Sequence, residues 1–188
     1  NKIFLLSDKL NELSAKGLSN FFAENLTLFL DIKMLETLGI SYPIKSPISY
    51  NGIGFLLTYD PKFRRLIVHK TDYEPLYPLE DVSATTDYQP NIIYYDAESQ
   101  RFSIFNVDSF INVDLNNTDY FRNRSFTISY SFEYDVWVSF HSYLPDYIFN
   151  DNYNFYSTQS NSIFKHNVGY YQQYYGTKAD HIIEVIFN

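Results

Sequence analysis

The sequence predicts a mostly β protein made of antiparallel hairpin units, with a short helical segment near the N-terminus. Two observations lead to this fold class. Short segments from residue 51 onward alternate apolar and polar side chains, as in "TISYSF" at 127–132, which is the pattern of a strand with one buried face. Tyr also recurs at a fixed distance before a second large apolar residue. A lone hairpin cannot bury its apolar face, so the sheets must stack.

Four hairpin units share a spacing of seven residues between a Tyr and an apolar residue on the next strand. The pairs are Tyr59 and Leu66, Tyr95 and Phe102, Tyr130 and Trp137, and, more weakly, Tyr156 and Ile163. The first three Tyr residues are 36 and 35 positions apart (95 − 59 and 130 − 95), which is near the blade length of repeat β structures. We therefore expect a β-propeller-like arrangement that forms part of a propeller.

The N-terminal part of the chain has a different character. "KIFLL" predicts a strand, and Ser19 is a candidate N-cap for a helix near 19–26. "LTLFLDIK" alternates like a strand, whereas a longer helix ending at Gly39 fits the apolar spacing imperfectly, so the segment after residue 26 is ambiguous. We divide the chain into 1–50, a strand, helix and connector or insertion, and 51–188, the hairpin repeats. Because Asn occupies position 1, we take the chain as a fragment of a longer one.

Two long segments between the hairpins, 73–91 and 106–124, are predicted to be exposed loops or edges where another chain docks. The first is rich in Glu, Asp, Pro and Thr. The second contains "NVDLNNTDYFRNR".

Composition removes several classes of function. With 14 Lys and Arg against 22 Asp and Glu the net charge is −8, which disfavours nucleic acid because binding to phosphates relies on basic side chains. The absence of Cys excludes disulfides and Cys-ligated zinc. No apolar run reaches the roughly 20 residues of a membrane-spanning helix. The 20% aromatic content, with 19 Tyr, suits half-exposed contact surfaces.

The four His residues offer weak candidates for chemistry. His69, His141, His166 and His181 show none of the spacings typical of metal sites, and no GxSxG nucleophile motif is present. His141 and His166 are the best pair, because they end equivalent strands of successive units. Packed or hydrogen-bonded roles are favoured for all four, so we predict no catalytic, cofactor-binding or metal-binding residue.

Acidic residues raise a second possibility. Asp146, Asp151, Glu80 and Asp81 on a Tyr-rich surface could bind sugars or, as a facing pair, hydrolyse a glycosidic bond. Exposed, solvated acids are the simpler interpretation. "NDNYN" at 150–154 alternates oxygen ligands like a calcium loop, but Phe155 stands where such a loop needs Gly.

The stretch "WVSFHSYLPDYIF" at 137–149 predicts a structural corner. Simple alternation sends Trp137, Ser139 and His141 to one face of a strand, and Val138, Phe140 and Ser142 to the other. Pro145 must end the strand pairing. We expect the Trp and Tyr rings to seal a junction between adjacent sheets.

The same stretch, together with "FYST", "FKHN", "YYG" and "DHIIEVIF", resembles a recurrent pattern in tail nozzle or muzzle proteins of crAss-like tailed bacteriophages. "GFLLTYDPKFRRLIVHKTD" and "SDKLNELSAKGLSNFF" also resemble propeller blade elements of such proteins. The resemblance covers most of 1–20 and 50–188. Its motifs are aromatic, and they carry over no functional residue.

This resemblance implies a non-enzymatic structural subunit in the tail of a virion. Such a subunit would pack against copies of itself and other tail proteins, and would hold or gate the DNA exit channel. An alternative is a carbohydrate- or receptor-binding β module of a virion or bacterial surface protein, in which exposed Trp137 and Tyr rings would stack on a host glycan. A glycosidase or peptidase domain is a third hypothesis for the function.

Overall fold

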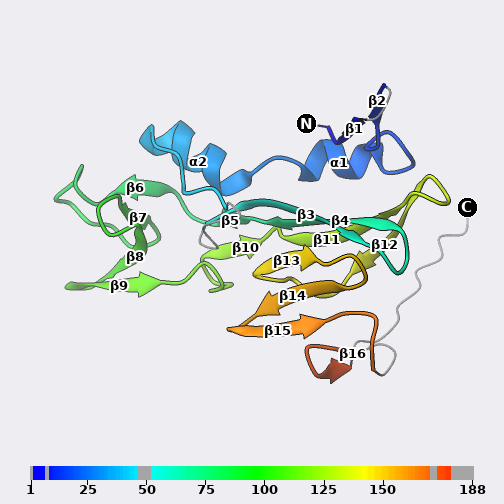
Figure 1. Ribbon diagram of the computed structural model, residues 1–188. Coiled ribbons are helices and arrows are strands. Elements are labelled where there is room, and N and C mark those ends of the chain that lie inside the picture. Colours follow the sequence, from blue (N-terminus) through cyan, green and yellow to red (C-terminus); the bar gives the residue numbers. More distant parts are fainter. Residues whose placement is uncertain (1, 7–8, 46–51, 170–172, 179–188) are drawn as a thin grey trace, which may run out of the picture. The chain divides into compact units, whose positions relative to one another are not determined.

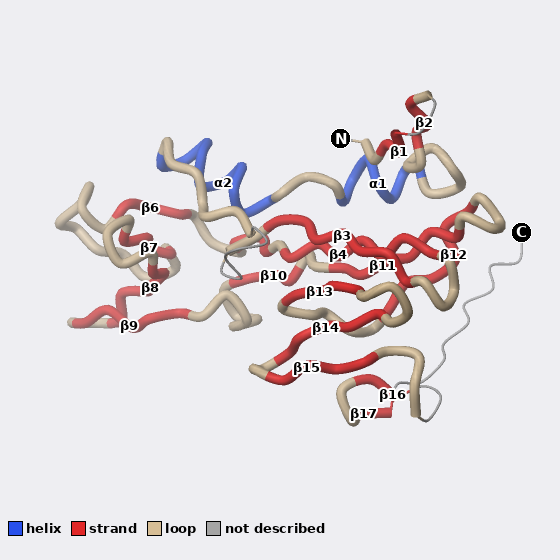
Figure 2. The backbone as a smooth tube through the Cα atoms, in the orientation of Figure 1, coloured by secondary structure: helices blue, strands red, loops and turns tan. Residues whose placement is uncertain are grey.

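The computed structural model describes residues 2–6, 9–45, 52–169 and 173–178. The protein is mostly β, with 44% of the described residues in strands and 10% in helices (Figure 1). Both helices lie in the N-terminal part of the chain, as Figure 2 shows. The predicted fold class is confirmed at this level. No closed barrel or propeller is found in the described part of the chain, so the propeller stays a prediction.

The chain forms two compact units. Unit 1 consists of residues 1–55 and 70–125, and unit 2 of residues 56–69 and 126–188. The units follow contacts in space and cut across the predicted division into 1–50 and 51–188, because one hairpin of unit 2 is contributed from within the sequence of unit 1. That predicted division describes the character of the sequence and stays a prediction.

The N-terminal elements belong to unit 1. Strands β1 (Phe4–Leu6) and β2 (Leu10–Glu12) pair antiparallel, and β1 confirms the strand predicted at "KIFLL". Helix α1 (Ser19–Asn25) confirms the predicted helix, although Ser19 is its first residue and the N-cap is Leu18. The ambiguous segment forms α2 (Phe29–Leu38), which ends at Gly39 in the left-handed conformation, φ 70°. Gly tolerates this conformation without a Cβ clash.

A buried ion pair starts helix α2. Its own N-cap residue, Leu28, has no polar side chain, and the carboxylate of Asp72 instead accepts hydrogen bonds from the backbone N–H groups of Phe29 (2.8 Å) and Leu30 (3.2 Å). Lys70 Nζ lies 2.7 Å from the same carboxylate, and both side chains are fully buried. Lys70 also donates to the carbonyls of Asn25 and Thr27, which joins the end of α1 to the start of α2.

Unit 1 contains a four-stranded sheet in the order β6-β7-β8-β9. The strands are β6 (Leu79–Asp81), β7 (Ile93–Asp96), β8 (Arg101–Asn106) and β9 (Ser109–Val113). β6 and β7 are parallel, whereas the other two neighbours are antiparallel. A separate pair joins β5 (Tyr73–Pro75) to β10 (Phe121–Asn123).

These strands correct the prediction for segments 73–91 and 106–124. Both segments contain strands, and Leu79, Val113 and Phe121 from them lie in the hydrophobic core of unit 1 with Leu30 and Met34 of α2. The sequence pattern misses them because each strand is only three to five residues long and interrupted by turns. Leu30 and Met34 are four positions apart, so they occupy the same face of the helix.

Unit 2 is built on a four-stranded sheet in the order β12-β11-β4-β3. Its strands are β3 (Gly54–Asp60), β4 (Arg65–Thr71), β11 (Phe126–Ser131) and β12 (Val136–His141). A second sheet contains β13 (Tyr147–Asn150), β14 (Phe155–Gln159) and β15 (Ser162–Lys165), and a small pair joins β16 (Gln173–Tyr174) to β17 (Thr177–Lys178). The two larger sheets share a core of Leu56, Ile67, Tyr143, Ile148 and Phe155.

The seven-residue spacing corresponds to a pair of facing residues in two of the hairpins. Tyr95 faces Phe102 and Tyr130 faces Trp137 across their strands, with ring centroids 4.9 and 5.2 Å apart. In the fourth unit Tyr156 instead faces Lys165, so the weaker copy has a different register.

Three hairpin loops have the same construction. The loops at 61–64, 97–100 and 132–135 each contain four residues, and the fourth has a positive φ of 49–56°. The polar side chain before each loop accepts a hydrogen bond from a backbone N–H inside it, which fixes the turn; these side chains are Asp60, Asp96 and Ser131.

Candidate functional site

The structure brings His141 and His166 together in unit 2, around a shared ring. The Tyr143 ring lies between them, with centroid distances of 5.0 Å to His141 and 4.8 Å to His166. His166 also stacks on Phe155 at 4.3 Å. The predicted pair therefore forms an aromatic stack in the core between the two sheets.

Burial determines the chemistry of this stack. It lowers the pKa of both His141 and His166 to about 4, so both rings are neutral at pH 7. His166 Nε2 lies 2.6 Å from Ser157 Oγ, which is 2.8 Å from the Tyr175 hydroxyl. Ser157 is fully buried, so its hydroxyl cannot reach a substrate as a nucleophile would have to.

The other two His residues contribute no further site. His69 is buried, and its Nδ1 lies 2.9 Å from Thr127 Oγ1. His181 lies outside the described residues. Within the ranges that the structure describes, no group of three or more His, Asp or Glu side chains could hold a metal ion.

The four candidate acids are divided between the two units. Glu80 and Asp81 belong to unit 1, whereas Asp146 and Asp151 belong to unit 2. Asp151 accepts backbone hydrogen bonds from Tyr153 and Asn154, which lowers its pKa to about 2. It therefore fixes the "NDNYN" turn. Asp81 and Asp146 likewise accept backbone hydrogen bonds, from Ser83 and Ser160.

A β-bulge corrects the predicted faces of β12. Ser139 faces Ser129 and Trp137 faces Tyr130, although Ser129 and Tyr130 are neighbours in sequence. Val138 is the extra residue, so Trp137 and Ser139 point to opposite faces of the sheet. Alternation fails here because an inserted residue reverses the side-chain direction beyond it.

The corner role is divided between two aromatic residues. Tyr143 lies in the core that both sheets of unit 2 share, as expected for a junction. Trp137 is only 8% exposed and packs edge-on against Tyr130 in the neighbouring strand of its own sheet. A side chain so covered offers no open platform for a sugar.

Exposed apolar residues border the buried rings on the same face of this sheet. Phe140 faces Ile128, which is two positions from Tyr130 in β11 and therefore lies on the same face of the sheet as Tyr130. Phe132 contacts both Tyr130 and Tyr59. We call four of these residues the apolar rim: Leu57 (57% exposed), Tyr59 (39%), Phe132 (38%) and Phe140 (56%). β3 and β12, which carry three of the four, are the outer strands of the sheet.

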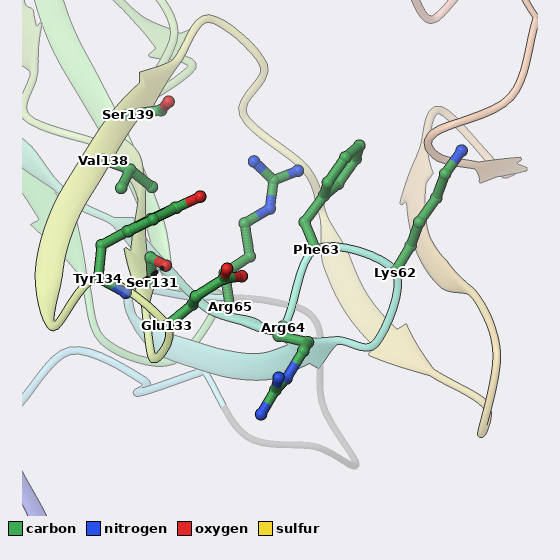
Figure 3. A pocket seen from close by; sticks show the side chains of 9 residues that line it. All are labelled: Lys62, Phe63, Arg64, Arg65, Ser131, Glu133, Tyr134, Val138 and Ser139. Atoms are coloured by element: carbon green, nitrogen blue, oxygen red, sulfur yellow. Dashed lines mark hydrogen bonds between the residues drawn. The ribbon is translucent and has the colours of Figure 1, made fainter.

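A pocket of about 380 Å³ opens beside two of the hairpin loops of unit 2 (Figure 3). It is lined by Lys62, Phe63, Arg64, Arg65, Ser131, Glu133, Tyr134, Val138 and Ser139. Figure 3 shows the Arg65 and Phe63 side chains extending to one side of the loop and Arg64 to the other. Phe63 is 51% exposed and Tyr134 71% exposed.

Buried Asp60 holds one wall of this pocket. Its carboxylate accepts hydrogen bonds from Arg65 Nε (2.9 Å), from the Lys62 backbone N–H (3.1 Å) and from Asn167 Nδ2. Lys62 Nζ in turn donates to the Asn167 carbonyl at 2.7 Å. These bonds fix the 61–64 loop against the segment that follows β15.

Comparisons with protein-family models, with curated proteins and with solved structures found no match for this chain.

The apolar rim and the pocket are both absent from the sequence-based candidates. The run Lys62-Phe63-Arg64-Arg65, three cations around an aromatic ring in an acidic chain, was the available signal for the pocket. No comparable signal marks the rim, because it combines residues from two strands and a loop, β3, β12 and the 132–135 loop. None of the helices in the described ranges is long and apolar enough to cross a membrane.

Proposed function

We propose that this protein is a non-enzymatic structural subunit of a multi-copy bacteriophage tail assembly, and that it acts by packing against neighbouring subunits. The resemblance of "WVSFHSYLPDYIF" and the associated motifs to nozzle or muzzle proteins supports the tail setting. The apolar rim is the observation that carries the packing role.

The physical reason for a packing role is the free-energy cost of leaving the apolar rim exposed to water. Exposed large apolar side chains that gather on one face are typical of interaction surfaces. Outer strands also present unpaired backbone groups to a neighbouring chain. Packing of Leu57 and Phe140 against another subunit would remove these side chains from water, and ring-shaped assemblies need such surfaces on every copy.

The chemistry of the described residues also favours packing over catalysis. The Ser157 hydroxyl that contacts His166 is buried, and Asp81, Asp146 and Asp151 accept backbone hydrogen bonds. Carbohydrate binding remains the second candidate, with the pocket in place of Trp137 as its basis.

Site-specific cross-linking in the assembled particle tests the proposal. The chain has no Cys, so an introduced thiol is the only one that it carries and reports a single position. We expect Leu57→Cys and Phe140→Cys to cross-link to a neighbouring subunit. Ile163→Cys on β15 is the matched control, because Ile163 is 68% exposed and lies outside the rim.

Cryo-electron microscopy of the same particle provides the independent measurement. Density for this chain in a symmetric ring of the tail, with the rim against a neighbour, supports the proposal. Density at a free peripheral tip with a solvent-exposed rim would refute it and favour receptor binding.

A further inference from the structure

The pocket beside the 61–64 and 132–135 loops concentrates positive charge in an acidic protein. Lys62, Arg64 and Arg65 line it with the acid Glu133, and buried Asp60 pairs with Arg65, so one positive charge remains in excess in a chain whose net charge is −8. A local excess of cations in such a chain attracts an anionic group.

Arg65 is the cation best placed to bind an anion. Its Nε is occupied by Asp60, and the guanidinium carbon lies 4.9 Å from the centre of the Phe63 ring. Neither Nη group makes a hydrogen bond to a residue in the described ranges. The guanidinium is therefore held in place at one edge and offers its other donors, in the geometry that matches a carboxylate.

Serine hydroxyls supply neutral polar contacts in the same place. Ser131 and Ser139 line the pocket, and Ser139 faces Ser129 across the strands, so their side chains lie on one face of the sheet. Ser129 is fully buried, and its Oγ has no hydrogen-bond partner in the structure. Because Ser129 Oγ is inaccessible, the exposed Ser139 is the serine that can bond a ligand in the pocket.

Two exposed aromatic rings complete the lining. Phe63 and Tyr134 come from different loops, and both are more than half exposed. Such rings present apolar faces to the C–H face of a sugar ring, and the Tyr hydroxyl can bond a sugar hydroxyl. The volume of about 380 Å³ is at the small end of ligand pockets, which fits one or two sugar rings better than an extended polypeptide.

We propose that this pocket binds a carboxylate-bearing sugar, a uronic acid residue of an acidic glycan. Arg65 binds the carboxylate, Ser139 bonds a ring hydroxyl, and the rings of Phe63 and Tyr134 flank the sugar. This site does not depend on the packing role, because none of its lining residues belongs to the apolar rim.

Titration of the 188-residue chain with D-glucuronate and with D-glucose, followed by ligand-observed NMR, tests the proposal. We expect glucuronate to bind at least about tenfold more tightly than glucose, as one charge-assisted bond pair implies. Tyr134→Ala should weaken glucuronate binding roughly two- to tenfold. Arg65→Lys, which keeps a cation beside Asp60 but removes the planar fork, should reduce the preference for glucuronate.

Two matched variants serve as controls. Tyr153→Ala removes an 80% exposed ring from another turn of unit 2, and Arg101→Lys changes the Arg that follows the equivalent loop in unit 1. Neither should alter binding. If Arg65→Lys lowers the melting temperature, Ser139→Ala at an exposed position replaces it, with a loss of affinity expected.

Three outcomes would overturn the proposal. One is equal affinity for glucuronate and glucose, or no binding of either. Another is equal loss of binding in the Tyr153→Ala and Tyr134→Ala variants. The third is tighter binding of pentaglutamate than of glucuronate, which would assign the pocket to an acidic polypeptide.

Discussion

The buried ion pair of unit 1 allows a quantitative test of how the helices are attached. Replacing Lys70 by Met removes the ammonium group from Asp72 and leaves the carbonyls of Asn25 and Thr27 without this donor. Asp72 keeps the backbone N–H groups of Phe29, Leu30 and Tyr73. We expect the free energy of unfolding to fall by about 3–5 kcal/mol, the usual cost of breaking a buried pair.

Replacing the other partner, Asp72, should lower the free energy of unfolding by a similar amount for a different reason. Asp72→Asn retains an oxygen that can accept from the start of α2, but it leaves the Lys70 charge buried without a counter-ion. Burial already lowers the pKa of Lys70, and Asp72 opposes that shift. The double variant contains no unpaired charge, so its loss should be smaller than the sum of the two single losses by about 1–3 kcal/mol.

Urea unfolding of the four proteins measures this coupling. Lys33→Met and Glu36→Gln provide the matched control, because that pair is 3.4 Å apart but more than half exposed, and its removal should cost less than about 0.5 kcal/mol. Losses at Lys70 and Asp72 that add to within about 0.5 kcal/mol would refute a direct interaction between the two charges.

Three further outcomes are expected in unit 1 or unit 2. Because folded His141 and His166 have a pKa near 4 against 6.5 in the unfolded chain, the unfolded state binds more protons between these values. Stability should therefore fall by about 2 kcal/mol for each ring, or about 4 kcal/mol for both, as the pH drops from about 7 to about 5, and by about half of that in a His141→Asn variant; a flat profile in urea unfolding would contradict the buried stack. Trp137, the only Trp, should emit at short wavelength and resist iodide quenching, whereas emission like that of free tryptophan would show that the ring is open. Gly39→Ala should cost about 1 kcal/mol in thermal unfolding through its positive φ alone, since nothing lies within 4 Å of the added Cβ; no change would mean that α2 ends differently.

Hairpins that combine strong alternation with a short polar loop could be predicted from the sequence. Tyr95 and Phe102, and likewise Tyr130 and Trp137, were recognised by spacing alone, because four loop residues with one positive φ place them opposite each other. Helix α2 was ambiguous for a tertiary reason. Its capping carboxylate comes from Asp72, far along the chain, so local capping signals are missing at Leu28.

The candidate site was less accessible to sequence reasoning. The approach of His141 and His166 followed from equivalent positions in successive hairpins and was predicted. The ring between them, Tyr143, lies in an irregular segment, and no periodicity places it there. The direction of Ser139 depends on the bulge at Val138, and a single inserted residue has no signature in the alternation of side chains.

The division of the chain into two units also has a consequence for synthesis on the ribosome. The hairpin of residues 56–69 emerges before the second half of unit 1, yet its sheet is completed by β11 and β12, which are made later. Leu56 and Ile67 therefore lack their core partners in the nascent chain until Tyr143, Ile148 and Phe155 have been synthesised. A truncation after residue 125 should leave these apolar residues exposed, and a stalled nascent chain of that length is the species that a chaperone would bind.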